Sequence, residues 1–150
     1  MNWKLVVVGG LVFWLVTFVV GFITGPIIHQ GILKEPYKSN AQFWRPELAQ
    51  DPPDMAALMP RWIASGILTG LIIAWIYGCV RSALNGSGWR RGLVYGLGLA
   101  ILNAATALGY SGVFNLPSII WTWWSIEGFV YYPIGGAVLG WVAQKLAPVS

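Results

Sequence analysis

The stretch Leu5–Ile28, LVVVGGLVFWLVTFVVGFITGPII, contains no charged residue. The hydrocarbon core of a bilayer is about 30 Å thick, and an α-helix needs about 20 apolar residues to cross it. Inside lipid the backbone N–H and C=O groups have no water to bind, so a spanning segment must pair them within itself as a helix. This stretch therefore predicts a transmembrane helix, and it decides the fold class of the chain.

Three more segments repeat this pattern, and the composition agrees with it. Hydrophobic residues make up 57% of the 150 residues and charged residues 9%, whereas soluble proteins average about 25% charged residues. We expect one all-α membrane domain, residues 1–150, with helices over about 4–28, 60–80, 92–110 and 118–144 and a long loop at 34–58. The first segment is too long for a signal peptide and no small-x-small cleavage site follows it, so we expect it to stay as a membrane anchor.

Basic residues predict how the chain crosses the membrane. Those at the predicted helix ends are Lys4, Arg81, Arg90, Arg91 and Lys145. No acidic residue accompanies them, and connections rich in Lys and Arg face the cytoplasm. We therefore expect both termini in the cytoplasm and the long loop on the outer side. Tryptophans gather near both predicted boundaries, which is typical of the aromatic belts of membrane proteins.

Small residues spaced four apart predict how the helices meet. Lipid tails are as apolar as leucine, so helices in a bilayer associate through close backbone packing and hydrogen bonds. Each predicted helix has one such glycine pair, namely Gly21/Gly25, Gly66/Gly70, Gly92/Gly96 and Gly136/Gly140. These GxxxG pairs are the expected packing sites of an antiparallel bundle of four transmembrane helices.

Glu127 lies in the stretch WTWWSIEGFVYY, residues 121–132, among the largest apolar side chains. A charged side chain at the centre of a membrane helix costs about 2.5 to 3.5 kcal/mol on insertion scales, so Glu127 is expected to have a polar partner. The candidates for this intramembrane polar site are Asn103, Tyr77 and Tyr131, with Thr106 and Arg61 as further partners. An interhelical hydrogen bond is the expected arrangement, and a proton, ion or ligand role is the alternative.

Gly136 follows Glu127 by nine positions, which is about 180° around a straight helix at 100° per residue. The two residues therefore face opposite ways. Three arrangements are open: Glu127 faces inward while Gly136 meets another copy or protein, the reverse holds, or Pro133 breaks the helix and turns both inward. A broken helix beside an intramembrane acid is typical of transporter binding sites.

The chain lacks the residues that several chemistries require. His29 is the only histidine and Cys79 the only cysteine, which excludes bis-histidine haem, HExxH zinc sites and intrachain disulfides. No GxxxxGK[ST] loop and no nucleophile elbow occurs in the sequence. We expect no enzyme activity, no cofactor and no metal, and no nucleic-acid partner because the basic residues form no run. A ligand or a single pigment at His29 or Glu127 stays open.

Short motifs give the chain a resemblance to a known group. They are Asn2–Leu11 (NWKLVVVGGL), Ile76-Tyr77 followed by Arg81, and Trp124 with Ile126-Glu127 leading to Gly136-Ala137 and Gly140-Trp141. The chain resembles an uncharacterised family of small four-helix bacterial inner-membrane proteins. The resemblance implies the same fold and a bacterial inner-membrane location, but no activity. The Phe43–Pro46 stretch departs from that family.

Two functions follow as hypotheses. The first is a non-enzymatic accessory or structural subunit of a larger bacterial inner-membrane complex, in which surplus small-residue faces pack against other membrane subunits or a second copy. The second is a small carrier or channel, proton-coupled, in which Glu127 and the Pro133 helix break form the site. The lipid bilayer is a partner in both.

Overall fold

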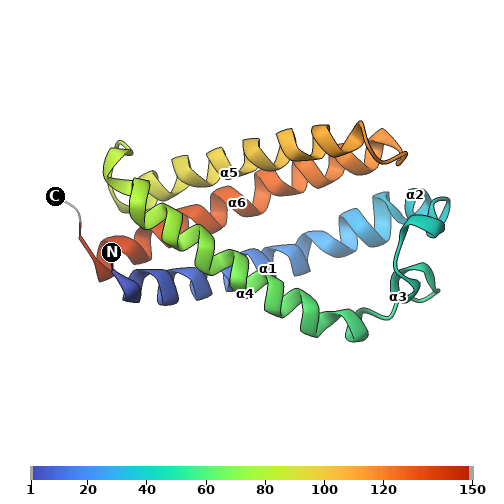
Figure 1. Cartoon of the computed structure of the whole chain (residues 1–150), viewed down its shortest axis with the longest axis horizontal. Helices are drawn as coiled ribbons and strands as arrows, with labels where there is room; N and C mark the ends of the chain where they lie inside the picture. The colour runs from blue at the N-terminus through green and yellow to red at the C-terminus, as the bar shows by residue number, and fades with distance from the viewer. Residues whose placement is uncertain (1, 149–150) are drawn as a thin grey trace.

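The computed structural model of the chain describes residues 2–148, and it confirms four long apolar helices (Figure 1). Each is long and apolar enough to cross a membrane: Leu5–Ile32, Met55–Ala83, Gly88–Ser111 and Ser118–Leu146. Within residues 2–148 the chain forms helices, turns and bends and no strand. Large apolar side chains, among them Phe22, Ile23, Leu102 and Leu108, are exposed on the outside of these helices, as lipid contact requires.

The first span comprises three consecutive helical segments. They are the π-helix η1 (Leu5–Gly9), α1 (Gly10–Ile27) and the π-helix η2 (Ile28–Ile32). The sequence predicts that Gly25-Pro26 bends or ends this helix, and the predicted end near residue 28 is wrong because Pro26 lies inside α1 and helical backbone continues to Ile32. After α1 the helix widens into η2, where Leu33 N donates to Ile28 O at 2.8 Å.

A connector, residues 33–54, joins the first span to the second. It contains α2 (Lys34–Lys38), the 3-10 helix η3 (Ala41–Phe43) and α3 (Pro46–Ala49). It ends at Asp54, whose side chain accepts a hydrogen bond from Ala57 N at 3.1 Å and so caps the next helix. We call the end of the molecule that carries these residues the connector end.

Four further helical elements complete the described chain. The second span is α4 (Met55–Val80), followed by the 3-10 helix η4 (Arg81–Ala83). It starts before the predicted residue 60 because Asp54 caps it and Pro60 fits into its second turn. The last two spans are α5 (Gly88–Ser111) and α6 (Ser118–Leu146).

The four spans are arranged around α6 and α1. Figure 1 shows that α6 runs beside α5 along its length and that α1 lies against α6 on another side, with α4 crossing α1. Successive long helices run in opposite directions, and both chain ends lie at the same end, which we call the terminal end. The main core cluster lies toward this end and contains Leu5, Phe13, Ile73, Ala74, Tyr77, Leu139 and Ala143.

Glycines allow α5 and α6 to touch at their backbones. A Cβ built on Gly92 would lie 2.8 Å from Gly140 Cα and would collide with Gly136 O. A Cβ on Gly96 would lie 2.8 Å from Pro133 Cα and would collide with Tyr132 O. All four glycines of the Gly92/Gly96 and Gly136/Gly140 pairs therefore lie at the α5–α6 contact, where any side chain would force the helices apart.

The contact between α1 and α4 uses different glycines from those expected on α1. Gly70 packs against Gly10, and Gly66 lies against the indole ring of Trp14. A Cβ on Gly21 would meet no described atom within 4 Å, and one on Gly25 would meet only His29, at 3.9 Å. The Gly21/Gly25 pair thus lies outside the helix contacts of residues 2–148.

Candidate functional site

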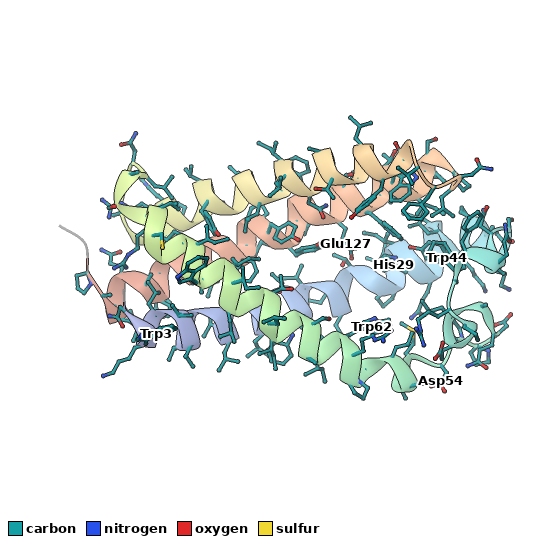
Figure 2. All side chains as sticks on the ribbon, in the orientation of Figure 1. Trp3, His29, Trp44, Asp54, Trp62 and Glu127 are labelled. Carbon is teal, nitrogen blue, oxygen red and sulfur yellow. The ribbon has the colours of Figure 1, made fainter. Side chains whose placement is uncertain are left out.

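Glu127 faces the first span near the connector end. Thr24 Oγ1 donates to Glu127 Oε1 at 2.5 Å, and His29 Nε2 lies 3.1 Å from Glu127 Oε2. Figure 2 shows His29 and Glu127 pointing toward one another between the first span and α6. Only 8% of Glu127 is exposed. The acid that the sequence leaves without a partner is therefore held by two side chains of the first span.

His29 lies at the start of the π-helix η2, directly after the regular helix α1 that carries Thr24. Residues five positions apart lie about 140° apart on a regular α-helix, so the two side chains leave the first span in different directions. Both nevertheless reach Glu127, Thr24 at Oε1 and His29 at Oε2. A π-turn closes an i to i+5 hydrogen bond, and such turns are frequent at functional sites.

Tyr37 extends the hydrogen-bonded chain toward the surface. Its hydroxyl lies 2.8 Å from His29 Nδ1 and accepts a hydrogen bond from Trp124 Nε1 at 2.7 Å. The phenol and imidazole rings stack with their planes 15° apart. Trp44 Nε1 donates to the backbone carbonyl of Tyr37 at 2.9 Å. Two indole N–H groups thus hold α2 over the Glu127–His29 pair.

The partners assign the direction of each hydrogen bond. An indole nitrogen can only donate, so the Tyr37 hydroxyl accepts from Trp124 and its own proton is directed to His29 Nδ1. His29 then carries its proton on Nε2 and donates it to Glu127 Oε2. With Thr24 donating to Oε1, an ionised Glu127 accepts at both oxygens, and every donor and acceptor in this chain is satisfied.

Aromatic and aliphatic side chains close the site at the connector end. Ile28, Leu33 and Ile120 are buried together beneath Tyr37, Trp44 and Trp124. The rings of Trp44 and Tyr37 meet edge to face with centroids 5.1 Å apart. We call Tyr37, Trp44 and Trp124 the aromatic cap. The His29 side chain is 35% exposed beside it and that of Glu127 11%, so His29 is the more exposed member of the pair.

The series of hydrogen-bonded polar side chains that begins at Tyr37 ends at Thr24 and Glu127. Thr17 lies about two helical turns further toward the terminal end. Its hydroxyl donates to carbonyls of its own helix, Phe13 O and Trp14 O. Beyond it lies the apolar core cluster around Phe13 and Leu139. Among residues 2–148, side-chain hydrogen bonds therefore connect Glu127 with the connector end only.

The partners expected from the sequence lie elsewhere. Asn103 Nδ2 donates to Trp124 O at 3.4 Å and packs against Gly128. Tyr77 is buried in the core cluster and pairs with the ring of Tyr95. Tyr131 packs against the ring of its neighbour Tyr132. Within the described chain, the side-chain hydrogen bonds of Glu127 go to Thr24 and His29 and to none of these three.

The opposite faces of α6 are both covered, and Pro133 does not break the helix. The Gly136 face packs on α5 while the Glu127 face packs on the first span, because α6 has neighbours on opposite sides. The helix break expected at Pro133 is wrong: α6 is continuous from Ser118 to Leu146. Pro133 is buried, and its Cα faces Gly96 of α5.

The pair does not form a metal centre. Glu127 and His29 provide two ligands, and within residues 2–148 no group of three His, Cys, Asp or Glu side chains gathers. A structural zinc site uses four protein ligands and a catalytic site three. Both ring nitrogens of His29 are already engaged, Nδ1 by Tyr37 and Nε2 by Glu127, which leaves none for an axial bond to a pigment.

Sequence reasoning missed Thr24, Tyr37 and Trp44 as parts of the site. The available signal was local: Gly25-Pro26 and Gly31 lie on either side of the only histidine, and such residues mark places where a helix deviates from regular geometry.

Comparison of the chain with protein-family models, curated proteins and solved structures gives no match in any of the three.

Tyr37→Phe is expected to loosen the aromatic cap. The change leaves Trp124 Nε1 and His29 Nδ1 without their shared partner, which costs about 1 to 3 kcal/mol. Burial raises the pKa of the Tyr37 hydroxyl to about 12 from an ordinary value of 10.0. The stability contributed by neutral Tyr37 is fully present below pH 10 and is lost as the pH rises toward 12.

Thermal unfolding followed by near-UV circular dichroism between pH 8 and 12 measures both effects. The wild-type protein should lose more stability above pH 10 than Tyr37→Phe does. Tyr110→Phe is the control, because Tyr110 is an exposed residue near the same end. Identical alkaline profiles for wild type and Tyr37→Phe would contradict a buried, hydrogen-bonded Tyr37.

Proposed function

We propose that this chain is a non-enzymatic, multi-pass protein of the bacterial inner membrane that works as a small proton-linked carrier. In this proposal the four spans form an antiparallel bundle with both termini in the cytoplasm. The Glu127–His29 pair takes up a proton from the outer side. The observation that carries the proposal is an acid inside a spanning helix, paired with a histidine that is reached from the connector end.

The charges support this orientation. Lys4, Arg81, Arg90, Arg91 and Lys145 belong to the terminal end, whereas four of the five acidic residues belong to the connector. The cytoplasmic side of a membrane protein is the side rich in Lys and Arg. The connector end is therefore the outer end in the proposal, and the bacterial location rests on the family resemblance.

The hydrogen-bond directions supply a route for the proton. A proton from outer water that reaches the Tyr37 hydroxyl allows Tyr37 to pass its own proton to His29 Nδ1, and the Nε2 proton then moves to Glu127 Oε2 across 3.1 Å. Tyr37 and His29 both end neutral, His29 as the other tautomer, and Glu127 becomes a neutral acid. Neutral Glu127 can donate to the unprotonated Nε2, so the hydrogen bond persists with its direction reversed while the negative charge between α6 and the first span is lost. In this proposal the loss of that charge couples proton uptake to movement of α6 against the first span.

Infrared difference spectroscopy on oriented proteoliposomes tests the proton site. Acidifying the outer solution should produce a protonated-carboxyl band that Glu127→Gln removes, and acidifying only the lumen should produce it much more slowly. Glu47→Gln is the matched control, because Glu47 is a carboxylate of the connector, paired with Arg45 at 3.1 Å. A band that survives in Glu127→Gln would exclude Glu127 as the proton site.

Proton flux tests the carrier itself. Vesicles containing a pH-sensitive dye and driven by a potassium diffusion potential should acidify faster with the wild-type protein than with Glu127→Gln or with empty vesicles. Equal flux in wild type and Glu127→Gln would overturn the carrier proposal even if Glu127 titrates.

The role as an accessory subunit stays a prediction with one favourable observation. Gly21 offers open space on α1, beside the exposed side chains of Phe22 and Ile23, and a small residue of this kind permits close approach of another helix. Purification in native detergent should then recover the chain with other membrane subunits or as a homo-oligomer. Gly21→Leu should release the partner, and a homogeneous monomer from the same preparation would exclude this role.

A further inference from the structure

A groove opens at the terminal end between the start of the first span, the end of α4 and the end of α6. Its volume is about 910 Å³, which lies within the range of about 300 to 1,000 Å³ that is typical of ligand sites. Asn2, Lys4 and Arg81 provide its polar lining, and Trp3, Val6 and Leu146 provide apolar surface. The groove is thus amphipathic and lies where the spans end.

Among residues 2–148, no acidic side chain lines this groove. The chain has five acidic residues; four lie in the connector, and the fifth, Glu127, is bound to His29 and Thr24. Arg81 donates one hydrogen bond, from Nη1 to Ala143 O at 3.2 Å. It also lines a second, smaller cavity of about 70 Å³ together with Arg91. Arg91 Nε is buried there without a hydrogen-bond partner among the described residues.

The Arg81 guanidinium makes one side-chain hydrogen bond among the described residues, and a phosphate group supplies acceptors that match guanidinium geometry. Lys4 and Arg81 line the groove together with the apolar side chains of Trp3 and Val6. A small free anion would leave these apolar side chains unused, whereas a phospholipid carries a phosphate and acyl chains in one molecule. Basic grooves between spanning helices on the cytoplasmic side are suited to anionic lipid headgroups.

We propose that this groove binds an anionic phospholipid, with its phosphate at Lys4 and Arg81 and the upper part of its acyl chains along Trp3, Val6 and Leu146. The inference requires that the chain lies in a membrane. It does not depend on proton binding, and it can be tested in the Glu127→Gln chain as well as in the wild type.

Cys79 provides the probe. It is the only cysteine, it is exposed, and it lines the groove. The rate of Cys79 alkylation by a thiol reagent is measured in detergent micelles with added phosphatidylglycerol, phosphatidylcholine of the same acyl chains, or inorganic phosphate. Phosphatidylglycerol should slow alkylation by about tenfold, and the other two should leave the rate within about twofold of the lipid-free value.

Variants test the assigned residues. Lys4→Gln and Arg81→Gln should each raise the phosphatidylglycerol concentration for half-protection by about fivefold, since one cation near an anionic lipid contributes about that factor. Arg81→Lys keeps the charge and should retain most of the protection. Arg90→Gln is the matched control, because Arg90 lies over the ring of Trp89 and does not line the groove.

Three results would overturn the proposal. Equal protection by phosphatidylcholine would remove the role of lipid charge, and protection by inorganic phosphate alone would assign the site to a free anion. Equal effects of Arg90→Gln and Arg81→Gln would reduce the effect to general surface charge. Near-UV circular dichroism of each variant separates these outcomes from misfolding.

Discussion

Gly96→Ala is expected to destabilise the protein by at least about 1 to 3 kcal/mol, although it adds a single methyl group. A Cβ at residue 96 collides with the carbonyl oxygen of Tyr132 and lies 2.8 Å from Pro133 Cα. These are backbone atoms of α6, so α5 and α6 must separate over several turns. Alanine favours a helix over glycine by about 1 kcal/mol. The protein is therefore expected to lose stability in spite of the higher helix propensity of alanine.

Gly98→Ala is the matched control for this prediction. Gly98 lies two positions further along α5, and a Cβ there would meet no described atom within 4 Å. It should leave the free energy of unfolding unchanged or raise it slightly, because alanine favours the helix. Reversible unfolding in mixed micelles titrated with a denaturing detergent gives both values. Equal effects of the two substitutions would refute the backbone contact between α5 and α6.

His29→Leu is expected to cost at least about 1 to 3 kcal/mol, because it removes a hydrogen-bond donor from a buried carboxylate. The substitution leaves Glu127 with Thr24 as its remaining side-chain partner in an apolar environment. It also removes the acceptor of the Tyr37 hydroxyl, so the aromatic cap should open. Unfolding in the same micelle titration measures the loss, and the fluorescence of cap tryptophans reports the opening.

The double variant His29→Leu with Glu127→Gln separates charge from packing. A neutral amide needs no cationic or donating partner as a carboxylate does, so the double variant should recover more than half of the loss. His29→Leu and the double variant share the same leucine, so the packing change is constant between them. A double variant as unstable as His29→Leu would show that His29 stabilises the protein by shape and not by pairing with the acid.

The four long apolar helices and the cap at Asp54 could be predicted from the sequence because each depends on neighbouring residues. A run such as Leu5–Ile28 must be helical in lipid whatever surrounds it. Asp54 lies directly before a segment with free N–H groups, and its carboxylate accepts from Ala57 N in the structure. The predicted helix boundaries were wrong where they were placed at prolines, because Pro26, Pro60 and Pro133 all lie inside helices.

One residue of the candidate functional site could be predicted from the sequence. Glu127 stands out because an acid among tryptophans and tyrosines requires an explanation wherever it is placed. Its partners did not stand out. The regular helical spacing of 100° per residue places His29 about 140° from Thr24, so the sequence gives no reason to pair both with one acid. Only the packing of α6 against the first span brings Glu127 within reach of both side chains.

The sequence by itself determined four helical segments long and apolar enough to cross a membrane, and the need of Glu127 for a polar partner. These follow from local composition, since a backbone in lipid must pair with itself over each apolar run. The tertiary structure alone decided that α6 packs on α5 through Gly136 and on the first span through Glu127. Which faces meet depends on the rotation and crossing of helices far apart in the chain, and no single segment encodes that geometry.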